Sequence, residues 1–244
     1  MAMQRILLYA AILAAWQLLA GAGILNDRIL PSPSRIAESF LTLLLSQQLL
    51  VHVAASMERV LVGFFLSVLV AVPLALLLST NSRMKYLLLP LVEFIRPVPP
   101  IAWIPLAIMW FGIGSTPSYF VTMIASFFPI FINTVSGVEN VSREHLNVAR
   151  CFGLSDGMLL RHVILPSSLP YILSGMRVGL GVAWMSVVAA EMIAAFSGLG
   201  YMITISQEML QAHKVLVGMI TIGVLGFALD NLMLRLKRGV IKWA

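Results

Sequence analysis

Long apolar runs alternate with short polar breaks along this chain, and each long run approaches the length of a membrane-spanning helix. The first, residues 6–24, holds no charged side chain and is close to the ~20 residues that cross ~30 Å of hydrocarbon. The later runs cover about 60–78, 86–111, 119–138, 170–195 and 215–234. The pattern predicts an all-α fold, a polytopic membrane helical bundle of about six transmembrane helices, with core spans over 60–234 and a single domain over 1–244.

The first run also has the single arginine and the apolar core of a secretory signal peptide. Its length and the further spans behind it favour a retained first span. Between the first two spans, Ser34 follows Pro33 as a candidate N-cap. Apolar side chains then recur at helical spacing, which predicts a short amphipathic helix on the outer surface; they are Ile36, Phe40, Leu43 and Leu44.

The low content of charge excludes a soluble domain. Only 11% of the residues are charged, whereas about a quarter is usual in soluble proteins. The formal net charge of +6 does not indicate nucleic-acid binding, because the basic residues lie at the edges of apolar runs. Cys151 is the only cysteine, so an internal disulfide and a zinc cluster are excluded.

The distribution of basic residues predicts the orientation of the spans, because cytoplasmic loops are enriched in lysine and arginine. One face collects Arg5, Arg83, Lys85, Arg143, Arg150, Arg161, Arg235, Lys237, Arg238 and Lys242. The other face holds Arg28, Arg35, Lys214 and, at the mouth of a span, Arg59. We therefore expect both termini and the 139–169 loop on the cytoplasmic side of the membrane.

The 139–169 loop has the pattern of a helical hairpin. Its first helix carries an apolar stripe and an opposite polar face over residues 143–152; the stripe is Leu146, Ala149 and Phe152, and the polar side chains are Arg143, Glu144, Asn147 and Arg150. Gly153 suits a left-handed turn. Ser155 suits the start of a second helix, and Pro166 is expected to end it near Leu165. Such a unit can fill a groove on a cytosolic partner or lie on the lipid surface.

The hairpin resembles the cytoplasmic signature of ABC-importer permeases, which reads Glu-Ala-Ala, three residues, Gly, nine residues, Ile, any residue, Leu-Pro. Asn147, Val148 and Ala149 stand at its first three positions, and Gly153, Val163, Leu165 and Pro166 complete it. Asn147 and Val148 depart from the family's Glu and Ala. The resemblance implies a coupling helix that docks on an ATP-hydrolysing subunit through Arg143, Leu146, Asn147, Ala149, Arg150, Phe152, Gly153, Leu165 and Pro166.

Two further segments, 93–114 and 190–203, are similar to those of the nitrate, sulfonate and taurine branch of these permeases, and "LPSPS" fits the same branch. The resemblance implies cytoplasmic ABC ATPase subunits, a second permease copy in a homodimer and an external solute-binding protein. It implies a small anionic solute such as nitrate, sulfonate, taurine or bicarbonate. The chain has no Gly-x-x-x-x-Gly-Lys-[Ser/Thr] loop. ATP and Mg²⁺ are therefore expected on the partner ATPase, and no cofactor is expected on this chain.

Clustered prolines predict that the third span is not one straight helix, because each proline removes a backbone donor. Irregular backbone survives in a membrane where protein or a water-filled cavity covers it, which favours a role in the translocation path over a kinked packing helix. Glu93 and Arg96, three residues apart, are expected to pair on one helical face. The candidates for the path or gate are Glu93, Arg96, Pro97, Pro99, Pro100, Trp103, Glu191, Gly198 and Gly200. Gly175 and Gly179 have the spacing of a helix-packing motif.

Two other functional classes compete with this interpretation. A membrane-embedded hydrolase would need a His-Glu-x-x-His or Gly-x-Ser-x-Gly motif, and neither occurs; the four histidines, His52, His145, His162 and His213, are expected outside the spans. An ion-coupled secondary transporter usually has more spans and internal repeats. We therefore predict a transport subunit and no enzymatic activity on this chain.

Overall fold

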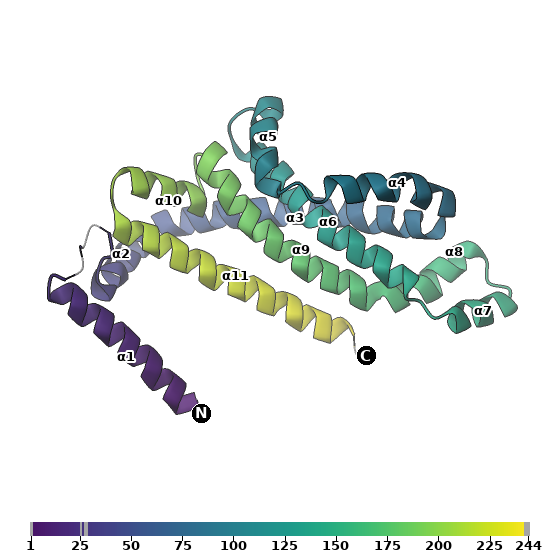
Figure 1. Ribbon diagram of the computed structural model, residues 1–244, viewed down its shortest axis with the longest axis horizontal. Helices are drawn as coiled ribbons and strands as arrows, with labels where there is room; N and C mark the ends of the chain where they lie inside the picture. The colour runs from purple at the N-terminus through teal and green to yellow at the C-terminus, as the bar shows by residue number, and fades with distance from the viewer. Residues whose placement is uncertain (1, 25, 27–28, 242–244) are drawn as a thin grey trace.

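The computed structural model describes residues 2–24, 26 and 29–241, and every regular element in these ranges is helical (Figure 1). In chain order the elements are α1 (Ala2–Gly21), α2 (Pro33–Leu45), α3 (Gln48–Thr80), α4 (Ser82–Ile95), the 3-10 turn η1 (Pro100–Trp103), α5 (Ile104–Phe111), α6 (Ser115–Glu139), α7 (Arg143–Cys151), α8 (Asp156–Leu159), the π-helical turn η2 (Leu160–Ile164), α9 (Leu165–Ala194), α10 (Leu199–Glu208) and α11 (Ala212–Val240). Arg28 and Lys242, which belong to the charge pattern above, lie outside the described residues.

Five of these helices are long and apolar enough to cross a membrane: α1, α3, α6, the continuous helix Asp156–Ala194, and α11. A sixth span exists if α4 and α5, which meet at an angle of 91°, are counted as one broken span. The prediction of about six spans is confirmed, and so is the break in the third. That break falls between Ile95 and Pro100, where the clustered prolines interrupt the helical hydrogen bonds.

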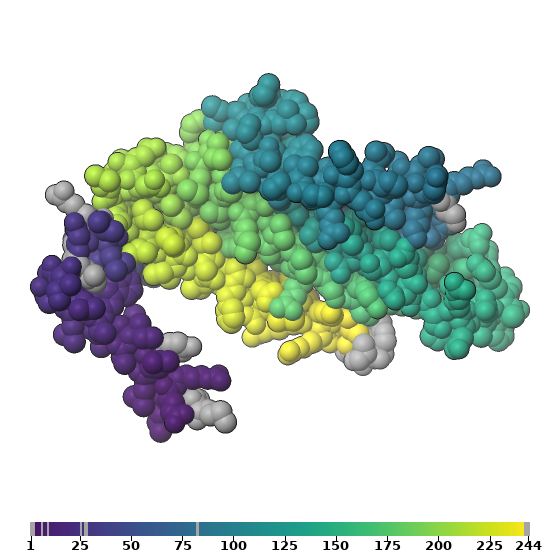
Figure 2. Space-filling model, viewed as in Figure 1, coloured from purple at the N-terminus to yellow at the C-terminus, as the bar shows by residue number. Residues whose placement is uncertain are grey.

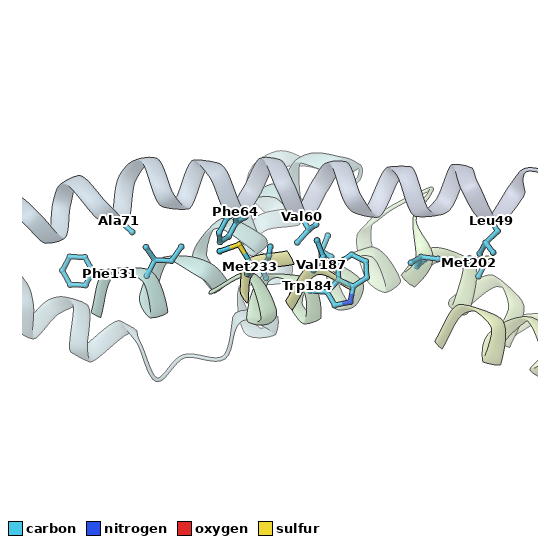
Figure 3. Close-up of a cluster of buried hydrophobic side chains, with 14 of the residues drawn as sticks. Leu49, Val60, Phe64, Ala71, Phe131, Trp184, Val187, Met202 and Met233 are labelled. Carbon is cyan, nitrogen blue, oxygen red and sulfur yellow. The ribbon is translucent and has the colours of Figure 1, made fainter. Parts of the chain in front are cut away.

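The centre of the molecule is formed by α3, α6 and α9. Along α3, Ala71 lies near Phe131 of α6 and Val60 lies near Val187 of α9 in one buried cluster (Figure 3). The helices α6 and α9 approach closely because α9 presents glycine: a Cβ atom on Gly175 would lie 2.7 Å from the Cβ of Asn133. A Cβ on Gly179 would lie 2.9 Å from Cγ1 of Ile130. The packing role of this glycine pair is thus confirmed within one chain.

The helix α3 begins at Gln48, well before the predicted start of the second span at Val60. Ser56, Glu58 and Arg59 make the preceding turns look water-facing in the sequence. Ser56 and Arg59 are in fact buried inside the protein, so the polar residues do not mark the end of the helix. His52, expected outside the spans, also lies within α3.

The hairpin is formed by α7, α8 and η2, at one end of the molecule (Figure 1). Ser142 caps α7 by accepting a hydrogen bond from the Glu144 amide (3.2 Å). Gly153 has a φ of +74°, so the left-handed turn is confirmed.

The predicted stop at Pro166 is wrong, because the chain continues through η2 into α9 and also passes through Pro170. The π-helical turn absorbs the first proline: the Leu165 amide donates to the Leu160 carbonyl, five residues back. This wider turn moves the backbone acceptors, so that Pro166 occupies the first turn of α9, where a missing donor has little cost.

The first two helices lie at the other end. None of the described side chains of α1 is buried, and Figure 2 shows this helix projecting away from the remaining spans. The amphipathic helix is confirmed as α2, with Ile36 and Leu43 buried. Its N-cap is Ser32 instead of the predicted Ser34: the Ser32 hydroxyl accepts from the Arg35 amide (3.4 Å), and Pro33 takes the first helical position.

Candidate functional site

A buried ion pair joins α3 to the last turns of α9. Nη1 of Arg59 lies 2.8 Å from Oε1 of Glu191, and the two side chains are 4% and 0% exposed. Because charges in such surroundings lose their hydration, they persist only when they are paired and hydrogen-bonded. The sequence pattern places Arg59 at the mouth of a span and does not predict its burial: the side chain is covered by the start of α6 and by the turn after α9.

Each partner of the ion pair is also held by neighbouring polar groups. The Glu191 carboxylate accepts from the Ser56 hydroxyl (2.8 Å) and from the Gly200 amide (3.0 Å). Arg59 donates to the Ser197 carbonyl (2.6 Å) and hydroxyl (2.7 Å), and to the Ser115 hydroxyl (3.1 Å). We call these residues, Ser56, Arg59, Ser115, Glu191, Ser197 and Gly200, the outer network. It connects α3, the start of α6, α9, the turn between α9 and α10, and the start of α10.

Glycines allow the turn between α9 and α10 to close over the Glu191 carboxylate. Gly198 has a φ of +108°, and a Cβ there would lie 2.3 Å from Cδ of Glu191. A Cβ on Gly200 would lie 2.3 Å from the Val188 carbonyl oxygen. The predicted break at 197–200 is thus present. Three of the candidate gate residues, Glu191, Gly198 and Gly200, lie in contact with one another at this break.

The other candidates for the path lie apart from this network. Glu93 and Arg96 are exposed near the end of α4, and no ion pair joins them in the described part of the chain. Glu93 lines an open hollow of about 690 Å³ together with Lys85. Lys85 pairs with Glu139 of α6, which ties the start of α4 to the end of α6.

The prolines and the tryptophan shape the bend between α4 and α5. Pro97 and Pro99 lie in the irregular connection, and Pro100 begins η1. Trp103 is partly buried against Ile104, a residue of a small cluster that also includes Ala190 of α9. The bend therefore packs next to the segment of α9 that carries Glu191.

The hairpin buries one side and exposes another. Ala149, Leu159 and Ile164 form a small core with Val141, and Leu146 packs against it. Phe152, in contrast, is 81% exposed. The predicted stripe is therefore only partly right: Leu146 and Ala149 face inward, whereas Phe152 projects from the hairpin. Arg143, Asn147 and Arg150 are exposed, Leu165 is half-buried and Pro166 is exposed.

The family described as "Binding-protein-dependent transport system inner membrane component" matches residues 63–242 of this sequence. This chain belongs to that family. A probable ABC transporter permease protein of Brucella melitensis is 41% identical to it, with 98% of this chain and 96% of that protein covered. A taurine transport system permease protein of Escherichia coli is 35% identical, with 96% of this chain and 87% of that protein covered.

The fold agrees with this membership. An inward-facing structure of the MetNI methionine ABC transporter superposes with a TM-score of 0.71 at 17% identity, covering 79% of this chain and 96% of the other. The chain is a multi-pass permease subunit of an ABC importer, as the hairpin motif predicts. The family implies a separate ATPase chain and a binding protein as partners, and the hydrolase and the secondary transporter are set aside.

Proposed function

We propose that this permease forms half of a translocation path for a small oxyanion or sulfonate and that its hairpin docks on a cytosolic ATPase. Relatives named for taurine, aliphatic sulfonate and nitrate transport support this solute class. Bicarbonate, also a small oxyanion, is included in the proposal. The observation that most supports docking is the position of Phe152, which is 81% exposed on a hairpin whose other side is packed. An exposed aromatic side chain on a rigid support is a typical anchor for a partner's pocket.

The hairpin surface has the features that docking requires. Ala149 and Leu146 hold α7 against the rest of the hairpin, and Gly153 sets the direction of the turn. Arg143, Asn147 and Arg150 are exposed polar side chains of the adjoining helix α7, of the kind found at the rim of a protein interface. Leu165 and Pro166 lie where the hairpin continues into the long helix α9.

A single helix connects the docking surface with the outer network. The helical segment Asp156–Ala194 is 39 residues long, which corresponds to about 58 Å at 1.5 Å per residue. The hairpin lies at its start and Glu191 near its end. Movement of the hairpin when the ATPase pair closes would thus reach the α9–α10 turn through one rigid element, as alternating access requires.

A second permease copy would cover the exposed face of α4 and α5. Tyr86, Phe94 and Met109 are 83%, 82% and 81% exposed there. With two copies related by a two-fold axis, the bend with Glu93, Arg96, Pro97, Pro99, Pro100 and Trp103 would border a central path, and the outer network would hold its gate closed. A homodimer is the simplest form of this assembly.

The remaining partners complete the cycle. ATP and Mg²⁺ would bind to the ATPase, without a cofactor on the permease, and an external binding protein would deliver the solute. The basic side chains near the hairpin support cytoplasmic termini in a bacterial inner membrane.

The test is transport by the reconstituted complex. The permease, its ATPase and its binding protein in proteoliposomes should accumulate radiolabelled taurine, methanesulfonate or nitrate only when ATP is supplied. Uptake that persists without the ATPase, driven by an ion gradient, would contradict the proposal.

A further inference from the structure

A charged groove between α9 and α11 has no role in the arrangement described so far. Its cavity measures about 430 Å³, and its lining includes Ser174, Arg177, Gly181, Met185, Asp230 and Lys237. A second hollow of about 240 Å³ adjoins it and shares Arg177 and Asp230. Ionisable side chains inside spanning helices are costly and usually functional, so this groove requires an explanation.

The groove follows one face of each helix. Ser174, Arg177 and Gly181 lie at spacings of three and four on α9, and Asp230 and Lys237 lie seven residues apart on α11. Seven residues correspond to about 10.5 Å along a helix. Lys237 lies in the last turn of α11, so the groove extends from this end toward the middle of the spans.

Asp230 orients the Arg177 guanidinium without using all of its donors. Nε and Nη2 of Arg177 donate to the two carboxylate oxygens at 2.6 and 2.7 Å. The Nη1 group donates to no protein acceptor within the described residues. Because a bidentate pair fixes the plane of the guanidinium, the unused N–H groups have a defined direction.

Lys237 adds a second set of donors and leaves the groove positive. Its ammonium donates to the Ser174 hydroxyl at 2.7 Å, which uses one of three hydrogens. Two cations and one carboxylate line the groove, so one net positive charge remains. Gly181 leaves open space, since a Cβ there would meet no atom within 4 Å. The groove therefore combines room, positive charge and oriented donors.

We propose that this groove binds a small oxyanion group, sulfonate or phosphate in type, between Arg177 and Lys237. Such a group accepts several charge-assisted hydrogen bonds, while Asp230 keeps the guanidinium in place. The oxyanion belongs to the transported solute or to an anionic lipid headgroup. In the first case the groove is a second solute site, separate from the path that α4 and α5 border, and this case rests on the proposed function.

The first measurement uses the complete permease–ATPase complex in nanodiscs of phosphatidylcholine, with radiolabelled methanesulfonate as the probe at constant ionic strength. Lys237→Met removes the charge near the end of a helix, where little folding cost is expected. We expect it to weaken binding at least about tenfold, the effect of one charge-assisted contact. Lys237→Arg should restore most of the affinity. Arg238→Gln is the matched control, because it removes the same charge one residue away, at an exposed position outside the lining.

The second measurement distinguishes the lipid. The same variants are placed in nanodiscs that contain phosphatidylglycerol, and native mass spectrometry counts the lipids retained. Binding of methanesulfonate or of phosphatidylglycerol that is lost in Lys237→Met and kept in Arg238→Gln supports the proposal. The probe that behaves in this way shows whether the oxyanion comes from the solute or from the lipid. Absence of binding in both measurements, or equal binding by Lys237→Met and the parent protein, overturns it. ATP-driven uptake is measured in parallel. If uptake occurs but the groove binds neither probe, the groove proposal fails while the proposed transport function stands.

Discussion

Replacing Arg59 with methionine should destabilise the protein more than the substitution of any exposed residue, because Arg59 holds the outer network together. The change removes the 2.8 Å contact with Glu191 and the donors to Ser197 and Ser115. The Glu191 carboxylate then remains 0% exposed with only two weaker donors. Leaving one partner of a buried pair without the other typically costs about 3–5 kcal/mol.

This cost predicts a large shift in thermal stability. For a domain of this size, 1 kcal/mol corresponds to about 2–4 °C in Tm, so Arg59→Met should lower the Tm of the purified complex by about 6–20 °C. The double variant Arg59→Met/Glu191→Met removes both charges and replaces them with apolar volume. It should recover much of the loss, because buried ion pairs are often replaceable by well-packed apolar residues.

The assay is thermal unfolding of the permease–ATPase complex in detergent, followed by the loss of soluble complex. Arg83→Met, which removes an exposed arginine at the start of α4, is the control and should change Tm by less than about 2 °C. A Tm for Arg59→Met equal to that of this control would refute the reasoning. So would a double variant that is less stable than Arg59→Met alone.

Three glycine substitutions test other parts of the structure. Gly153→Val places a branched residue at a φ of +74°, and we expect about 1–2 kcal/mol of strain in the hairpin and reduced co-purification of the ATPase. The control is Gly157→Ala, within α8, where the added Cβ would meet no atom within 4 Å; this variant should co-purify with the ATPase as the parent protein does. Equal recovery of the ATPase with both variants would count against the hairpin geometry. Gly200→Ala should lower Tm and uptake, because its Cβ would lie 2.3 Å from the Val188 carbonyl, while Gly223→Ala on the open side of α11 should lower neither. Gly175→Leu should prevent close packing of α6 on α9 and reduce the yield of folded complex in size-exclusion chromatography, and a normal elution profile would contradict that packing.

The spans and the hairpin were predictable because their signals are local. An apolar run of spanning length, a proline cluster and a glycine after an amphipathic segment each act on the backbone within a few residues. The third span breaks where its prolines lie, and Gly153 has the predicted left-handed conformation.

The outer network was not predictable from the same signals. Arg59 and Glu191 are 132 residues apart in sequence, and polar residues near the start of an apolar run are normally solvated. Only the packing of α3 against α9 shows that Ser56 and Arg59 belong to the interior. An unpaired Glu191 within an apolar run was the one hint that a distant cation was needed.

Two local errors have physical reasons of the same kind. Pro166 does not stop the helix, because the π-helical turn before it shifts the backbone acceptors. Phe152 belongs to the apolar stripe by spacing, but it follows the last residue of α7 and projects outward. Helical periodicity does not extend past a helix end, so it assigned the wrong face to this side chain.

Cross-linking from Cys151 tests the central claim, the docking of the hairpin on an ATPase, most directly. This single cysteine is exposed at the end of α7, beside Phe152, so a photoactivatable maleimide attached to it samples the proposed interface without any engineered residue. In membranes that contain the assembled complex, we expect a cross-link to the ATPase subunit, and none when Cys151→Ser is combined with Gln47→Cys between α2 and α3. A Cys151 adduct that never contains the ATPase, in a complex still able to transport, would contradict the account.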